Sequence, residues 1–89
     1  MDFEWDLAKA RDNEAKHRVS FAEATEVFAG NISSTVADPD HSLEEERFVI
    51  FGKTLRDRHL VVAFTERGGR IRIISAREMT RRERQAYEQ

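Results

Sequence analysis

The second half of the chain contains three stretches with the pattern of β-strands, and these constrain the fold more than any other feature. They cover residues 47–53, 59–65 and 70–77. Arg67-Gly68-Gly69 separates the last two and is typical of a hairpin turn. Residues 60–64 are apolar on both faces, which favours a central position for that strand. Successive hairpins of this kind predict an antiparallel sheet.

Helix signals lie on both sides of these strands. Asp6 is a good N-cap for a helix over residues 7–16, and Ser20-Phe21-Ala22-Glu23 is a capping box that opens a second helix. Gly30 fits the C′ position at the end of the second helix. Thr80-Arg81-Arg82-Glu83 opens a last helix that reaches Tyr87. With short strands at residues 3–5 and 32–36, we predict an α+β fold: a small antiparallel β-sheet with two N-terminal helices and a C-terminal helix.

Size and composition exclude several classes of protein. We expect the 89 residues, 1–89, to fold as a single domain. The absence of cysteine excludes a disulfide scaffold, a thiol nucleophile and a cysteine-based zinc site. The longest apolar run, residues 60–64, is far shorter than the ~20 residues of a membrane span, and the acidic start does not have the pattern of a signal peptide. The expected location is the cytoplasm, without membrane association.

Charge is distributed unevenly along the sequence. Residues 1–46 contain four basic and twelve acidic residues, a net charge of −8, whereas residues 47–89 contain eleven basic and five acidic residues, a net charge of +6. Twelve of the fifteen basic residues are arginine, whose guanidinium group binds phosphate through paired hydrogen bonds. The basic half therefore favours a phosphate-bearing partner, RNA or DNA. The alternative is a solvated charged surface, with an arginine excess that reflects genome composition.

Strand alternation sorts the basic side chains onto the two faces of the predicted sheet. In residues 70–77 one face carries Arg70, Arg72, Ile74 and Ala76, and the other carries Ile71, Ile73, Ser75 and Arg77. In residues 47–53, one face carries Arg47, Val49, Phe51 and Lys53. Arg72 and Arg77 are thus expected on opposite faces unless a β-bulge intervenes. The arginines either form a phosphate-binding cluster on the open side of the sheet or pair singly with carboxylates such as Glu46 and Glu66.

The three histidines do not predict a metal site. His17 ends the first predicted helix beside Lys16, where it either binds phosphate or donates a proton, or simply complements the helix end. His41 lies in a turn that resembles a calcium loop only superficially, because Leu43 replaces the required glycine, so we expect a polar turn. His59 is expected at the surface. The sequence has no P-loop, nucleophilic serine motif or His-x₃-His pair, and we expect no metal or cofactor.

Cleavage of RNA is a reaction that such a chain can perform without a metal ion. The ribose 2′-OH is the nucleophile, so the protein need supply only alignment, proton transfer and stabilisation of the charged phosphorane. An arginine cluster together with a Lys, His, Glu or Tyr side chain is sufficient for this. DNA has no 2′-OH, so the same site should not cut it.

An ordered series of residues resembles the toxins of the BrnT family. Its first part is Phe3-Glu4-Trp5-Asp6, Lys9, Asn13, Lys16-His17, Val19-Ser20-Phe21, Glu23-Ala24, Val27-Phe28, Asp40-His41-Ser42, Glu46-Arg47 and Thr65-Glu66-Arg67. Its most specific part is the segment Arg70-Ile71-Arg72-Ile73-Ile74-Ser75-Ala76-Arg77 with Thr80, Glu83-Arg84 and Tyr87. The series spans nearly the whole chain. Two departures are Met79, where alanine is expected, and Leu7, where proline is common.

The resemblance implies a toxin of a type II toxin–antitoxin system that has a RelE-like α+β fold and cleaves RNA. It also implies a BrnA-like antitoxin with a ribbon-helix-helix DNA-binding part. In such systems the toxin–antitoxin complex binds operator DNA through the antitoxin and represses its own promoter, whereas the free toxin blocks translation and growth.

Roles for nine residues follow as predictions. The catalytic candidates are Arg67, Arg72, Arg77, His17 and Glu46, and the substrate-binding candidates are Lys16, Arg47, Arg70 and Tyr87. Arg72 is favoured for stabilising the phosphorane, while Arg77 either shares this role or pairs with a carboxylate. Glu46 is either the base or the ion partner of Arg47, and Tyr87 either stacks on a base or packs on the sheet. The competing functions are a non-catalytic module that binds nucleic acid or an antitoxin, and a structural partner of other proteins.

Overall fold

The α+β prediction is confirmed, and the sheet has five strands in the order β1-β5-β4-β3-β2. The computed structural model describes residues 1–30, 34–37 and 46–89. Its elements are β1 (Asp2–Glu4), α1 (Leu7–His17), α2 (Phe21–Ala24), the 3₁₀ helix η1 (Thr25–Ala29), β2 (Ser34–Ala37), β3 (Arg47–Lys53), β4 (His59–Arg67), β5 (Arg70–Glu78) and α3 (Arg81–Tyr87). The strand predicted to be central, β4, lies in the middle of the sheet.

One strand pair departs from the antiparallel pattern. The β2–β3, β3–β4 and β4–β5 pairs are antiparallel, as their short connections require. β1 instead lies parallel to β5 at the sheet edge, with Glu4 opposite Arg72. Parallel strands need a long connection, and the elements from α1 to β4 provide it between β1 and β5. The sheet is therefore mixed.

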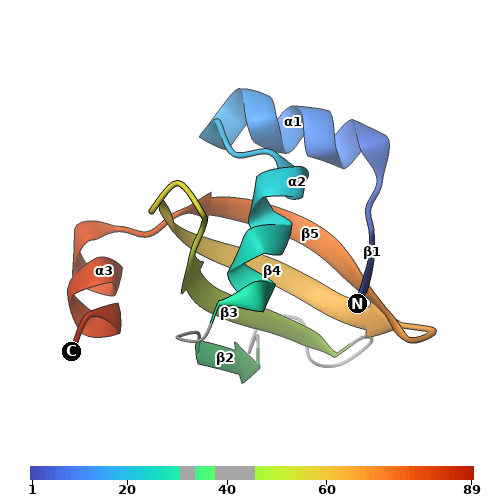
Figure 1. Cartoon of the computed structure of the whole chain (residues 1–89). Helices are drawn as coiled ribbons and strands as arrows, with labels where there is room; N and C mark the ends of the chain where they lie inside the picture. The colour runs from blue at the N-terminus through green and yellow to red at the C-terminus, as the bar shows by residue number, and fades with distance from the viewer. Residues whose placement is uncertain (31–33, 38–45) are drawn as a thin grey trace.

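The helices before the sheet cover one of its faces (Figure 1). Val27 of η1 is buried against the sheet side chains Leu60, Val62, Phe64 and Ile73, which form the centre of the core. The helix layer and the sheet lie closest together at Gly52. A Cβ atom at this position would lie only 3.0 Å from the Val27 Cβ, so a larger residue would not fit without a shift. No helix in the described residues has the length and apolarity that crossing a membrane requires.

The predicted helix starts are confirmed, and the second helical segment ends before Gly30 as predicted, but with a different backbone conformation. The side chains of Asp6, Ser20 and Thr80 accept hydrogen bonds from the first turns of α1, α2 and α3, and Thr80 forms a full capping box with Glu83. A glycine at the C′ position is usually left-handed, but Gly30 is extended, with φ −71° and ψ 144°. The chain leaves α2 through the 3₁₀ turn of η1, which requires no left-handed residue.

A β-bulge in β5 corrects the predicted faces of that strand. Ala63 pairs with Ser75 and Phe64 pairs with Ile73, so Ile74 is an extra residue that reverses the alternation after it. Ile73 and Ala76 are both buried in the core, although strict alternation places them on opposite faces. Arg72 lies opposite Thr65 and Arg77 opposite Val61, four residues apart on regular β4. Arg72 and Arg77 were expected on opposite faces unless a β-bulge intervened; the bulge does intervene, and they share the face away from α1 and α2.

We call this second side of the sheet the open face. By register and alternation it carries Arg47, Val49, Phe51 and Lys53 from β3, His59, Val61, Ala63, Thr65 and Arg67 from β4, and Arg70, Arg72, Ser75 and Arg77 from β5. Of the described helices, α3 contacts this face, and it does so at one end through His59 and Arg77. We refer to this as the α3 end, and to the opposite one, beside the β4–β5 turn, as the hairpin end.

Candidate functional site

A row of polar residues crosses four strands near the hairpin end. Arg47 of β3 and Arg72 of β5 both lie opposite Thr65 of β4, and Arg72 lies opposite Glu4 of β1. The neighbouring row pairs Arg67 with Arg70. The Thr65 hydroxyl donates a hydrogen bond of 2.6 Å to the backbone carbonyl of Glu46, which fixes the chain just before β3. The structure thus brings together five of the nine predicted site residues: Arg47, Arg67, Arg70, Arg72 and Glu46.

Arg72 is held in place by a carboxylate of the neighbouring strand. Its Nη1 donates to the Glu4 Oε2 at 2.7 Å, and both side chains are 28% exposed. The expectation that arginines pair with carboxylates is right for Arg72, although the partner is Glu4 rather than Glu46 or Glu66. This contact orients the Arg72 side chain. It uses one of the five N–H donors that a guanidinium group has.

Arg77 and Tyr87 lie at the α3 end instead. Thr65 and Val61 are four positions apart on β4, which puts the rows of Arg72 and Arg77 about 13 Å apart. Both terminal nitrogens of Arg77 donate to the Glu83 carboxylate, at 2.7 and 3.0 Å, so Arg77 also fastens α3 to the sheet. Tyr87 packs edge-to-face against the His59 ring with centroids 5.7 Å apart. The same end also contains Lys53, opposite His59 in the register.

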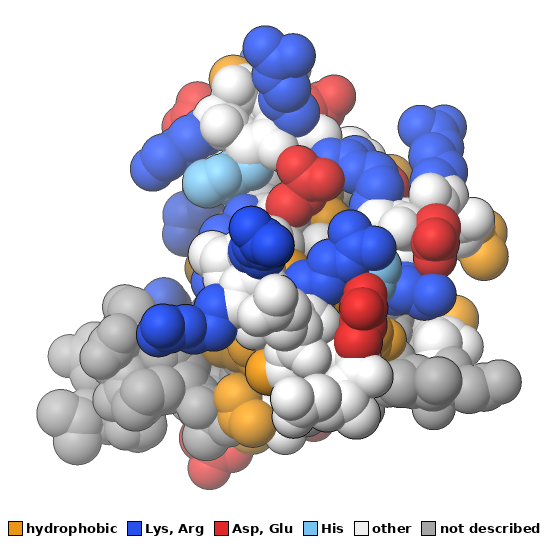
Figure 2. Space-filling model, turned by 90° about the vertical axis from the view of Figure 1, so that its left-hand side faces the viewer, with side chains coloured by type: hydrophobic (Ala, Val, Ile, Leu, Met, Phe, Trp, Pro, Cys, Tyr) orange, Lys and Arg blue, Asp and Glu red, His pale blue; other side chains and the backbone are white. Residues whose placement is uncertain are grey.

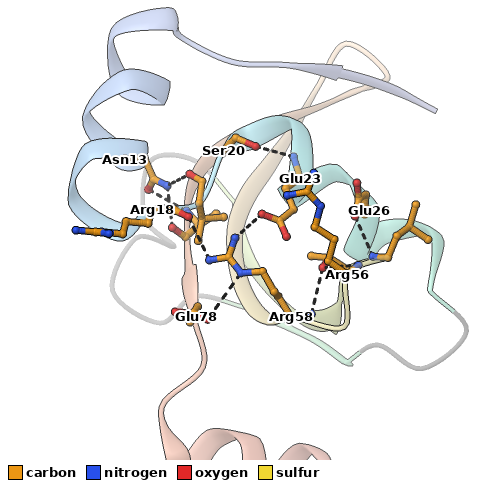
Figure 3. Close-up of polar contacts among 12 residues, drawn as sticks. Asn13, Arg18, Ser20, Glu23, Glu26, Arg56, Arg58 and Glu78 are labelled. Atoms are coloured by element: carbon orange, nitrogen blue, oxygen red, sulfur yellow. Dashed lines mark hydrogen bonds and ion pairs between the residues drawn. The ribbon is translucent and has the colours of Figure 1, made fainter.

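Lys16 and His17 are not brought to the arginine row. They form the last turn of α1, on the other layer of the molecule, where Lys16 is exposed and His17 half-buried. Beside them Arg58 joins three segments: its nitrogens bind the Glu23 carboxylate at 2.6 Å, the Arg18 carbonyl at 3.1 Å and the Glu78 carboxylate at 3.8 Å (Figure 3). Figure 2 views the molecule from this side, and Lys and Arg side chains are spread over both layers, with Asp and Glu side chains among them.

His59 is a buried polar side chain of the open face that the sequence pattern did not predict. It was expected at the surface, but it is only 9% exposed because α3 covers it, and its Nε2 lies 3.4 Å from the Glu88 Oε1. The hairpin register alone would have placed it beside Lys53 on the open face. Its burial depends on the position of α3, for which the strand pattern gives no signal. The turn around His41 lies outside the described residues.

Comparison with known proteins decides the family. A sequence model described as "Ribonuclease toxin, BrnT, of type II toxin-antitoxin system" matches residues 5–83. The chain belongs to the BrnT family. The resemblance predicted from the ordered residue series is thereby confirmed. Membership identifies the chain as a ribonuclease toxin of a type II toxin–antitoxin system, for which RNA is the substrate and an antitoxin the partner.

A solved structure supports the BrnT fold. The chain is similar to the crystal structure of the Brucella abortus ribonuclease toxin, BrnT, with a TM-score of 0.67 and 24% sequence identity. The likeness covers 91% of this chain and 99% of the Brucella chain. No curated protein matches the sequence. At this level of identity the similarity shows that the two proteins share a fold.

The open face carries its positive charge on arginine and lysine side chains. Within residues 1–30, 34–37 and 46–89 there is no group of three or more His, Asp or Glu side chains placed so that it could hold a metal ion. By register, the cationic groups of the open face are the guanidinium groups of both ends and Lys53, and His59 lies beside Lys53.

The Arg77–Glu83 pair predicts a pH dependence of stability. The hydrogen bonds from Arg77 lower the pKa of Glu83 from 4.5 to about 2. A carboxyl group whose pKa is lower in the folded state stabilises the fold above its unfolded pKa, and this contribution is lost as the pH falls from 4.5 towards 2. The contribution is about 1 kcal/mol, since solvent screens the pair.

The measurement is urea unfolding of the wild type and Glu83→Gln at pH 6 and pH 2.5. Glutamine keeps the capping box with Thr80 and removes the charge. Wild type should be the more stable protein at the higher pH and lose this advantage at the lower one. An equal difference at both pH values would show that the pair contributes nothing through ionisation.

Proposed function

We propose that this chain is a metal-independent endoribonuclease that cuts RNA by attack of the ribose 2′-OH on the adjacent phosphate. Family membership supplies the substrate class. The observation that carries the mechanism is the row Arg47–Thr65–Arg72 on the open face, flanked by Arg67 and Arg70. Fixed guanidinium groups supply the positive charge that the pentavalent phosphorane requires, and arginine matches the geometry of phosphate oxygens.

The reaction balances without a cofactor. The 2′-oxygen forms a bond to phosphorus as its proton leaves, the bond from phosphorus to the 5′-oxygen breaks, and that oxygen takes up a proton. The products are a 2′,3′-cyclic phosphate and a 5′-hydroxyl. We assign stabilisation of the phosphorane to Arg72, contacts with neighbouring phosphates to Arg47, Arg67 and Arg70, and acceptance of the 2′-OH proton to Glu46, which adjoins the row.

The remaining predicted residues act farther along the bound RNA. Arg77 and Tyr87 lie at the other end of the open face, where a phosphate contact and a stacked base extend the binding surface. Lys16 and His17 lie on the other layer of the molecule. We therefore assign them a contact with a phosphate at the periphery of the bound RNA, away from the bond that is cleaved.

The antitoxin is proposed to be BrnA-like, with a ribbon-helix-helix part. In this proposal the toxin–antitoxin complex binds operator DNA through the antitoxin, and the free toxin cleaves RNA and inhibits translation. The support is membership of a type II toxin family. Co-expression with the product of a neighbouring short reading frame should restore growth that the toxin alone arrests.

The decisive experiment is cleavage of a labelled RNA by the purified protein in the presence of EDTA. The expected result is undiminished cutting, fragments that end in 2′,3′-cyclic phosphate, and no cutting of a substrate with a 2′-deoxyribose at the cleaved position. Loss of activity in EDTA that Mg²⁺ restores would contradict the metal-independent mechanism. RNA binding without cleavage would favour the alternative, a non-catalytic docking module.

A further inference from the structure

A polar cavity at the α3 end of the open face has no role in the cleavage chemistry proposed above. Its volume is about 460 Å³, which is within the range of small-ligand sites. It is lined by Lys53, Asp57, His59, Arg84, Tyr87, Glu88 and Gln89. These residues come from the end of β3, the turn into β4, the start of β4, and α3 with the two residues that follow it.

The carboxylate of Glu88 sits among cationic groups in this cavity. Arg84 Nε donates to its Oε1 at 2.9 Å, and His59 Nε2 lies 3.4 Å from the same oxygen. The hydrogen bond from Arg84 lowers the pKa of Glu88, and the charges of His59 and Lys53 act in the same direction. The surroundings therefore favour an anion at the position that the Glu88 carboxylate occupies.

The charge of the cavity matches one phosphodiester group once Glu88 is removed. Asp57 is paired with Lys53 at 2.9 Å. Counting Lys, Arg, Asp and Glu, the lining is neutral with Glu88 in place and carries one positive charge without it. Glu88 follows the last residue of α3 and its side chain is 53% exposed, so displacing it moves one side chain and leaves the sheet intact.

We propose that the cavity is a phosphate-binding subsite for RNA, in which the Glu88 carboxylate occupies the anion position until a phosphate of the substrate displaces it. This inference rests on the proposed ribonuclease function. Arg84 and His59 hold the phosphate, and the Tyr87 ring packs edge-to-face against His59 at the side where a neighbouring base would lie. His59 is six residues along β4 from Thr65, so the subsite grips RNA about 20 Å from the Arg72 row.

The first test measures binding of 2′-O-methyl RNA, which lacks the attacking hydroxyl, to Glu88→Gln by fluorescence anisotropy. Glutamine keeps the size of the side chain and removes the competing charge, so the Kd should fall by about five-fold, the effect of one released ion pair in a partly solvated site. Glu14→Gln is the matched control, since Glu14 is an exposed residue of α1 and the change in net charge is the same. Its Kd should change by less than about two-fold.

The second test removes a proposed ligand of the phosphate. Arg84→Gln should weaken binding of the same RNA and lower the slope of log Kd against log salt concentration by about 0.7, the value of one phosphate contact with a single strand. Arg11→Gln, at an exposed position of α1, is the control and should leave the slope unchanged. Thermal unfolding of all four variants verifies that each is folded.

The outcomes separate this inference from the proposed function. Equal tightening by Glu88→Gln and Glu14→Gln would show a general charge effect and overturn the subsite, even if RNA is cleaved as proposed. Selective tightening by Glu88→Gln would support the subsite even if the wild type fails to cut RNA. In a parallel titration, inorganic phosphate should shift the NMR signals of the His59 ring. If phosphate shifts these signals but Arg84→Gln leaves the slope of log Kd for RNA against log salt concentration unchanged, the cavity is a site for free phosphate and the RNA subsite is overturned.

Discussion

Replacing Arg72 by alanine is expected to lower the rate of RNA cleavage by about 10²-fold, equivalent to about 2.7 kcal/mol of transition-state stabilisation. Arg72 lies in the middle of the row that crosses the open face, between Thr65 and Glu4, and Glu4 fixes its orientation before RNA binds. A charge that is already oriented stabilises the phosphorane without reorganisation at the moment of reaction. The measurement is the single-turnover rate on a labelled RNA at saturating protein concentration.

The companion variant Glu4→Gln separates catalysis from structural pairing. If Arg72 acts only by holding β1 against β5, both variants break the same 2.7 Å contact and should reduce activity alike. If Arg72 contacts the reacting phosphate, Glu4→Gln keeps the guanidinium group and an amide oxygen that can still accept from it, so only part of its orientation is lost and cleavage should stay within about three-fold of wild type. Urea unfolding provides the control, because losing this partly exposed pair should cost about 1 kcal/mol in either variant. An Arg72→Ala protein that is folded and fully active would remove Arg72 from the site.

The parts of this fold that the sequence predicts are those decided by local patterns. The three long strands, the N-caps at Asp6, Ser20 and Thr80, and the central position of β4 each follow from a few adjacent residues. The parallel pairing of β1 with β5 joins residues 68 apart, such as Glu4 and Arg72, and no local pattern encodes it.

The candidate site was harder to predict, because its geometry depends on one inserted residue. Ile74 looks like any other strand residue in the sequence, yet as the bulge it moves Arg77 onto the face of Arg72. The burial of His59 and the pairing of Arg77 with Glu83 depend likewise on where α3 packs. Residue types and charge predict candidate side chains, while tertiary pairing decides which of them meet.

The largest expected loss of stability is in Asn13→Ala, at about 3 kcal/mol. Asn13 is a 7% exposed residue of α1, and its amide group donates to the carbonyls of Val19 and Ala76 at 3.0 and 2.8 Å. Its side-chain oxygen accepts from the Ala76 N–H at 3.0 Å (Figure 3). Alanine would leave three buried backbone groups without these bonds, and an unsatisfied buried group costs about 1–3 kcal/mol.

The position of Asn13 on the sheet explains why this loss should be large. β1 pairs with β5 at residues 70–72, and farther along the same edge the side chain of Asn13 binds both the N–H and the carbonyl of Ala76, as a neighbouring strand would. Asp12→Ala, one residue earlier on the exposed side of α1, is the control for the higher helix propensity of alanine. It should change the free energy of unfolding by less than about 0.5 kcal/mol. Urea midpoints that move equally in the two variants would show that α1 does not protect this edge. A selective loss of about 3 kcal/mol in a domain of this size, whose whole stability is about 4–13 kcal/mol, would make the toxin fold strongly dependent on one amide.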